Sequence, residues 1–350
     1  MTTQDGSGGR QELVSALLGR VHPGGVRAAW WGGEYRFRLD RFAAVFPEAA
    51  DSGADAATLG KVFAHPVVGA IARSEAADGR DDWRPVRAAL RVDAALDGGG
   101  VVAELGTGAP GRRVHLPGTG LVCDTGTGEL RRLAVVDGLE VNNIDPSLSV
   151  WSDHVDTDLT FDWCTLVRAA QAFIAELGDP DFTDAISLTT VLVPLLQRDG
   201  AEFGRSSRFE IESGSVTSAV GAALISPGTG DAVNFAEAMV HESYHNLFNM
   251  ALELDAFEQP NAAEFYAPWK GTTRPTRAVL HGIVAFSAIM RFWRQIGRTR
   301  TDWSKYADEL VARRSEQVLG AASAVLSAGV LTDLGEEFAA AAVADAEALA

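Results

Sequence analysis

Residues 236–248 read AEAMVHESYHNLF, and this stretch decides the expected fold of the second half of the chain. It places His241 and His245 four residues apart, with Glu242 directly after the first, in a chain that has only 7 histidines. Residues four apart share one face of an α-helix, so both imidazoles can reach one ion. The preceding residues, SPGTGD, break a strand and let Asp231 cap a helix. The pattern therefore predicts a metal-binding helix after Asp231.

A protein metal site needs at least a third ligand, and two residues compete for that position. The metzincin pattern fails because positions 248 and 251 hold Phe248 and Ala251 instead of Gly and His. Glu264, 19 residues after His245, has the spacing of a gluzincin but lies between two close prolines. His281 lies in RAVLHGIVAFSAIMRFW, an apolar helix in which an unpaired histidine is costly to desolvate. A lone histidine there is usually a hydrogen-bonded core residue, but beside an HExxH motif the ligand role is favoured.

Composition limits the classes of partner. The chain has 350 residues, of which 47 % are hydrophobic and 22 % charged, enough for one large or two ordinary domains. Its net charge of -17 argues against nucleic acid and anionic membrane surfaces as partners. Cys123 and Cys164 form no zinc or disulfide pattern, and no apolar run approaches about 18 residues. We expect a cytoplasmic protein, whose oligomeric state the sequence does not indicate.

The distribution of polar, apolar and glycine residues along the chain predicts three parts. Residues 1–10 are polar and rich in Gly and Ser, so we expect a flexible terminus. Residues 11–146 read as a mostly helical subdomain followed by hairpins, among them LVCD at 121–124 and RLAVV at 132–136. We place the boundary near Pro146, and residues 147–350 form the HExxH domain. The N-terminal half is a candidate for recognising a leader peptide, although Trp30 and Trp31 in it are expected to be core residues.

The second half predicts an α+β fold. A helix is expected at 158–178, and ISLTTVLVPLL at 186–196 and GSVTSAVGAALIS at 214–226 read as two buried strands. The metal helix follows, and long Ala-rich helices are expected after Trp303. A peptide substrate is often held as an added strand at a sheet edge, and the strand at 215–225 is our candidate for that edge.

The motif and its surroundings resemble a known family. AEAMVHESYHNLF, followed by YAPWKGTTRPTRAVLHGIVAF at 266–286, resembles the α-ketoglutarate-dependent HExxH-type peptide β-hydroxylases, which act on ribosomally made, modified peptides. The shared features are the lead into HExxH, an aromatic-Pro-Trp turn, the pair Arg274-Pro275, and a helix with LHG and AF that starts at Leu280. The resemblance covers roughly residues 150–350.

This resemblance implies a zincin-like catalytic domain, with the HExxH helix and flanking strands, that holds iron(II) through His241, His245 and His281. Three protein ligands leave room for α-ketoglutarate at two positions and dioxygen at one. The implied reaction is hydroxylation of a side-chain β-carbon in a precursor peptide. A carboxylate of α-ketoglutarate requires a cation, and Arg274 matches the Arg-Pro element of the family. Arg277, one turn before His281, is the alternative.

Four further residues near the motif have predicted roles. In a zinc peptidase Glu242 would be the general base, worth about 10²- to 10⁴-fold in rate, whereas in a hydroxylase it would orient the metal ligands or the substrate. Glu237, one turn before His241, is expected either to support the metal ligands or to lie at the surface. Tyr244 and Tyr266 are candidate neighbours of the substrate, with core packing as the alternative.

Three functions are therefore compatible with the sequence. The first is an iron(II)/α-ketoglutarate-dependent peptide hydroxylase with His281 as third ligand. The second is a zinc metallopeptidase with Glu264 as third ligand and Glu242 as general base. The third is a non-catalytic peptide-binding module with structural histidines.

Overall fold

The computed structural model describes residues 6–47, 54–74, 80–92, 105, 112–143, 159, 161–196, 211–260 and 263–349. The chain divides into two compact units, each built from separate segments. Unit 1 comprises Met1–Trp30, Ala170–Leu188 and Ala232–Ala350, and unit 2 comprises Trp31–Ala169 and Thr189–Asp231. The predicted boundary near Pro146 lies outside the described residues.

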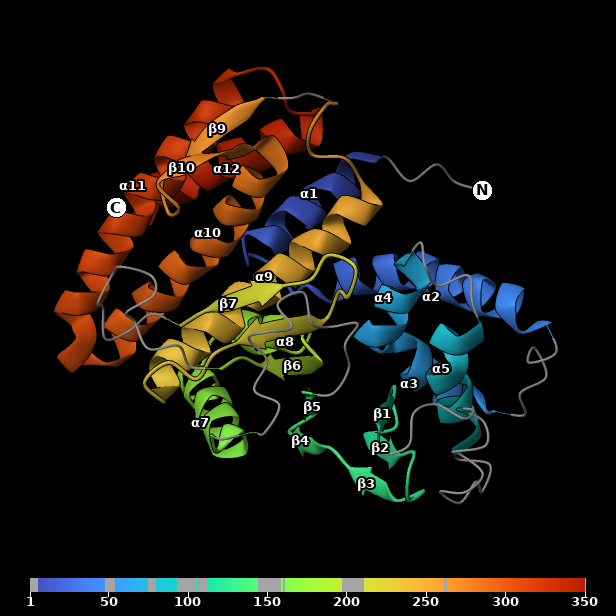
Figure 1. Ribbon diagram of the computed structural model, residues 1–350. Helices are drawn as coiled ribbons and strands as arrows, with labels where there is room; N and C mark the ends of the chain where they lie inside the picture. The colour runs from blue at the N-terminus through green and yellow to red at the C-terminus, as the bar shows by residue number, and fades with distance from the viewer. Residues whose placement is uncertain are drawn as a thin grey trace. The chain divides into compact units, whose positions relative to one another are not determined.

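In the described part of the chain, helices are mixed with three small sheets, which confirms the α+β class (Figure 1). None of the described helices is both long and apolar enough to cross a bilayer.

The described residues of unit 1 are mostly helical and include one hairpin. Neighbouring helices in this unit pack as pairs: α9 with α10, α10 with α11, α11 with α12, and α1 and α8 each with α9. The pairs α9 with α10 and α10 with α11 lie side by side in Figure 1. The helices are α1 (Gly6–Leu17), α8 (Pro180–Ile186), α9 (Ala232–Leu254), α10 (Thr276–Thr299), α11 (Ser304–Ser327) and α12 (Asp333–Leu349), and the turn η4 (Thr301–Trp303) joins α10 to α11.

The hairpin leads from the end of α9 into α10. Its strands β9 (Glu264–Ala267) and β10 (Thr272–Pro275) pair antiparallel. The turn between them is closed by the amides of Lys270 and Gly271, which both donate to the carbonyl of Ala267. Gly271 has a φ of 68°, a conformation that suits glycine. Proline at the end of β10 cannot continue a ladder but is well suited to precede a helix, and α10 begins at the next residue.

Unit 2 combines helices with two sheets. Helices α2 (Gly24–Val45) and α7 (Trp163–Glu176) each have residues in both units. The other helices, α3 (Ala56–Ala64), α4 (Pro66–Arg73) and α5 (Arg80–Val92), contribute to a buried apolar cluster that includes Phe63, Trp83 and strand residues of both sheets.

The smaller sheet of unit 2 has the order β1-β2-β3 and is antiparallel, and the larger has the order β4-β5-β6-β8-β7. In the larger sheet, β5, β6 and β8 run parallel while the two outer strands pair antiparallel. The strands are β1 (Arg113–Leu116), β2 (Leu121–Asp124), β3 (Leu130–Arg132), β4 (Ala134–Val136), β5 (Leu139–Val141), β6 (Val191–Pro194), β7 (Ser213–Ser215) and β8 (Ala222–Ile225).

Most predicted elements are confirmed, and two differ. The predicted flexible terminus at 1–10 is helical from Gly6, and residues 1–5 lie outside the described part. The single strand predicted at 214–226 is wrong, because β7 and β8 are separate strands of a hairpin. The apolar residues between them, such as Val216 and Ala219, are buried in the core cluster although they form a turn. The candidate edge at 215–225 is therefore corrected: β8 is internal, and only β7 lies at an edge.

Candidate metal centre

Helix α9 carries the two histidines of the HExxH motif on a single face. Most residues from Phe235 to the end of the motif are buried, but Glu237, His241 and His245, each four residues from the next, are only partly buried. This stripe marks the side of α9 on which small molecules can approach the rings.

The HExxH histidines are already at ligand spacing. Their Nε2 atoms lie 3.1 Å apart, and the ring centroids are 4.6 Å apart. Two ligand atoms at about 2.1 Å from one ion would lie about 3.0 Å apart in an octahedron and about 3.4 Å apart in a tetrahedron. The pair therefore fits one shared ion.

His281 reaches the pair from α10. Its ring centroid is 5.4 Å from that of His245, and the two Nδ1 atoms are 3.4 Å apart. His245 thus faces its two neighbours with opposite nitrogens. All three histidines are among the described residues, and no choice of one nitrogen from each brings all three within 4.8 Å of one another. Convergence on one ion requires rotation about the side-chain bonds of His245 or His281.

Burial keeps all three rings neutral. It lowers the pKa of His241 to about 3, with the charges of Arg314 and Lys270 acting in the same direction. It lowers the pKa of His281 to about 4, with a further contribution from Arg277. Burial and the two neighbouring histidines hold the pKa of His245 well below its usual range. Neutral imidazole is the form that binds a metal, so no proton has to be displaced at pH 7.

Aromatic rings line the site beside His241. Phe286 of α10 lies 5.2 Å from the His241 ring, and Trp269 of the hairpin lies 5.0 Å from Phe286. Gly282 makes this arrangement possible, because a Cβ on that residue would overlap the indole of Trp269. The Gly of the LHG segment therefore provides the space for this aromatic wall.

Arg314, Lys270 and Arg277 lower the pKa values of the histidines. The sequence predicted a role at the site for Arg277 but not for the other two. The guanidinium of Arg314 lies 4.5 Å from the centroid of Phe286. Arg314 and Lys270 both depress the pKa of His241. Lys270 follows the aromatic-Pro-Trp turn directly and could have been found there, whereas Arg314 lies on α11, 33 positions beyond His281, with no signal in the sequence.

The two predicted α-ketoglutarate-binding arginines are both exposed. Arg277 forms an ion pair with Glu258 at 3.3 Å and acts on the charge of His281. Arg274 lies in β10, opposite Phe265 in the ladder.

The remaining predicted residues lie in different surroundings. Burial raises the pKa of Glu237, against the opposing charge of Arg314. Glu242 is buried. The hydroxyl of Tyr244, also buried, accepts a hydrogen bond from Arg291 at 2.6 Å. Tyr266 is 58 % exposed on β9.

Glu264, the alternative third ligand, lies in β9 with its side chain exposed. Its carboxylate accepts a hydrogen bond from the Thr273 hydroxyl at 3.2 Å. His281, by contrast, contacts His245 directly. The geometry favours His281 over Glu264 as the partner of the HExxH pair.

A second group of possible metal ligands lies in unit 2. Within the described part of the chain, the one set of three or more His, Cys, Asp or Glu side chains with ligand atoms all within 4.8 Å of one another is His65, His115 and Glu140. All three are buried, and the set could hold a metal ion. The sequence gives no sign of it, because the residues are 50 and 25 positions apart. No model of a known protein family matches this chain, and no curated protein does.

Proposed function

We propose that this protein is an iron(II)- and α-ketoglutarate-dependent oxygenase that hydroxylates a β-carbon of a side chain in a ribosomally made precursor peptide. The observation that carries the proposal is the row of three neutral histidines, with the Nε2 atoms of His241 and His245 3.1 Å apart and His281 against His245. The resemblance of residues 236–248 and 266–286 to peptide β-hydroxylases supplies the reaction class.

The donor set fits iron(II). Three imidazoles suit iron(II) and zinc(II) about equally, and three protein ligands leave positions for small molecules. With α-ketoglutarate and dioxygen, bound iron(II) supplies the oxidation of an unactivated C–H bond. The chain would hold the metal through His241, His245 and His281. Glu242 directly follows His241 in the sequence and is buried, and it would orient the metal ligands or the substrate.

The charges around the histidines favour an anionic cosubstrate. Arg314 and Lys270 act on His241, and Arg277 acts on His281, so positive charge is present beside both ends of the row. α-Ketoglutarate carries two carboxylates, and a guanidinium can bind a carboxylate through two hydrogen bonds. Among the arginines, Arg314 and Arg277 are better supported for this role than Arg274, because their charges act on the histidines.

The aromatic wall would exclude water from one side of the site. Phe286 contacts the ring of His241 edge to face, Trp269 packs against Phe286 at a tilt, and Arg314 lies over the Phe286 ring. Removing water strengthens the attraction between the cations and a bound carboxylate. It also protects reactive species from side reactions with solvent.

The test is anaerobic binding of iron(II) with α-ketoglutarate, followed by the visible charge-transfer absorption of the complex. We expect the band in wild type and in Glu264→Ala, and its loss in His281→Ala. His22→Ala is the matched control, since His22 is an exposed histidine of the same unit.

A zinc peptidase would give the opposite pattern. Its metal binding would survive His281→Ala and be lost in Glu264→Ala, and Glu242→Gln would abolish peptide hydrolysis with the metal retained. A binding module without a metal would give no band in any variant. Either pattern would overturn the proposal.

A further inference from the structure

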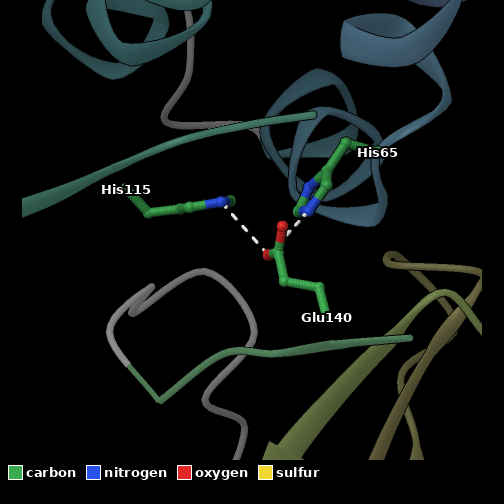
Figure 2. Close-up of side chains that lie close together, drawn as sticks. All are labelled: His65, His115 and Glu140. Atoms are coloured by element: carbon green, nitrogen blue, oxygen red, sulfur yellow. Dashed lines mark hydrogen bonds and ion pairs between the residues drawn. The ribbon is translucent and has the colours of Figure 1, made fainter. Parts of the chain in front are cut away.

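Three buried side chains of unit 2 converge from three separate elements. His65 lies between α3 and α4 and caps α4, His115 lies on β1, and Glu140 lies on β5. Figure 2 shows both rings directed at the carboxylate of Glu140. Their exposed fractions are 7 %, 2 % and 7 %, so the group is shielded from solvent.

The distances match those between ligands of one ion. The Nε2 atoms of His65 and His115 each lie 3.1 Å from Oε1 of Glu140. The amide nitrogen of Asn142 lies 3.0 Å from the same oxygen and 3.2 Å from Nδ1 of His115. Nitrogen and oxygen ligands of a tetrahedral zinc ion are about 3.3 Å apart.

The segment that carries His65 is held firmly in place. Arg38, fully buried, donates hydrogen bonds to the carbonyls of Phe63 and His65. The cation is itself paired with Glu34, which also binds Arg73 through both carboxylate oxygens. A rigid surround of this kind is what a preorganised ligand site requires.

Glu140 is the acidic member of the group. Burial raises the pKa of Glu140, but the hydrogen bonds and charges of His115 and His65 outweigh it and hold that pKa well below the usual range, so the carboxylate is ionised. No Lys or Arg of the described residues forms an ion pair with it. A buried carboxylate is normally paired with a cation or bound to a metal.

Both nitrogens of each ring have a polar neighbour. Nδ1 of His65 accepts from the Val67 amide at 3.3 Å, and Nδ1 of His115 lies 3.2 Å from the side-chain amide nitrogen of Asn142. The Nε2 atoms of both rings face the Glu140 carboxylate, each 3.1 Å from Oε1.

We propose that His65, His115 and Glu140 form a second metal site, which binds a divalent first-row transition ion of the zinc type through the two Nε2 atoms and the carboxylate. The ion would neutralise the buried charge and cross-link the α3–α4 junction, β1 and β5. Two histidines with one carboxylate are a common ligand set for such ions. This site is independent of the HExxH histidines, which lie in unit 1.

A metal bound at Nε2 requires the ring proton on Nδ1, where it needs an acceptor. On His65 the Nδ1–H would face the Val67 amide, also a donor, so metal binding would break this capping hydrogen bond of α4. Asn142 can provide an acceptor to His115 by turning its amide, so that the oxygen and not the nitrogen faces the ring. Asn142→Asp would provide a fixed carboxylate acceptor and should tighten metal binding about tenfold, while Asn142→Leu should weaken it about 10- to 100-fold. Without a metal, Asn142→Asp places a second carboxylate against Glu140 and should lower the melting temperature.

The experiment uses the full chain with His241→Ala and His245→Ala, which silences the HExxH site. Metal is first removed with a chelator, and Co²⁺ is then titrated as a coloured substitute for Zn²⁺. We expect one equivalent bound, with visible d–d absorption and a raised melting temperature. Glu140→Gln in the same background should lose this binding, and circular dichroism checks that it remains folded.

Two results would overturn the proposal. The first is that the His241→Ala, His245→Ala double variant binds no Co²⁺. This result does not depend on whether a variant of His65, His115 or Glu140 folds, because none of these residues is substituted. The second is binding that is indifferent to Glu140→Gln and to both Asn142 variants. Neither result bears on the oxygenase proposal, because the HExxH site is disabled throughout.

Discussion

His241, His245 and His281 owe their neutral state to burial more than to neighbouring charges, because desolvation is the largest cause of each lowered pKa. A metal ion would offset this cost by coordinating the ring nitrogens. Without the metal, the row should be a source of instability at mildly acidic pH. The unfolded chain takes up protons on these rings near pH 6.5, whereas the folded chain does not do so until about pH 4 at His281 and about pH 3 at His241.

This difference gives a prediction for the metal-free protein. Between pH 6.5 and about 4 the unfolded state binds more protons than the folded state, so the free energy of unfolding falls as the pH falls. The slope is at most about 1.4 kcal/mol per pH unit for each histidine. Guanidinium unfolding at pH 6.5 and pH 4.5 measures it, and His281→Gln should make the dependence shallower. An unchanged slope in that variant would contradict the low pKa.

A second prediction concerns the cations. Arg314→Gln and Arg277→Gln should each weaken α-ketoglutarate binding about tenfold, close to the 1.4 kcal/mol of one lost charged contact. Arg274→Gln is the matched control, because the charge of Arg274 is not among the causes of the lowered pKa of any of the three histidines. This variant should bind α-ketoglutarate normally. Titration calorimetry with iron(II) under anaerobic conditions measures the affinities. A loss confined to Arg274→Gln would restore the family-based assignment.

At the scale of elements, the packing of the hairpin on α10 shapes the site. At Gly282 the Trp269 indole occupies the space that a Cβ would fill. Gly282→Ala should displace Trp269 and, through Phe286, loosen the wall beside His241. We expect turnover to fall about 10- to 100-fold with the fold retained, because a displacement of about 1 Å near a reacting group costs that much.

Gly320→Ala is the control for this substitution. A Cβ at Gly320 meets nothing within 4 Å, and the residue is likewise helical, on α11. It should leave activity intact and stabilise the helix slightly. Equal activity of Gly282→Ala and Gly320→Ala would show that the wall does not matter for turnover.

The edge of the larger sheet offers a further test. Among the described strands, β7 is an outer strand of this sheet, so it is the part of the predicted substrate strand that lies at an edge. In the register of the β7–β8 ladder the N–H of Ser215 faces away from β8, so Ser215→Pro removes a donor at the outer edge. It should raise the KM for the peptide, with little change in α-ketoglutarate consumption without peptide. Val135→Pro on β4, the opposite edge, is the comparison. An equal peptide KM in both variants would reject β7 as the docking strand.

Local patterns predicted the elements well where one face is buried. The helical spacing of the HExxH stretch and of the residues around His281 produced α9 and α10, because apolar periodicity and breaking residues act locally. The strand error at 214–226 had a tertiary cause. Val216 and Ala219 are apolar because they fill the core from a turn, and a single sequence does not separate that from a buried strand.

At the scale of the whole molecule, each compact unit is assembled from segments that are far apart in the sequence. Unit 1 joins the first residues to the last part of the chain, and unit 2 takes two segments from between. The HExxH pair could be predicted because four-residue spacing brings its ligands together within a helix. His65, His115 and Glu140 could not, because tertiary structure alone brings them together from a helix junction and two strands.

The measurement that tests the central claim most directly is succinate formation. The metal-free full chain is loaded with iron(II) anaerobically and exposed to air with α-ketoglutarate, and succinate is quantified for wild type, His281→Ala and Glu264→Ala. We predict succinate from wild type and Glu264→Ala, and at least a 100-fold loss in His281→Ala. Wild type that forms no more succinate than a metal-free control, or His281→Ala that matches wild type, would contradict an iron site made of these three histidines.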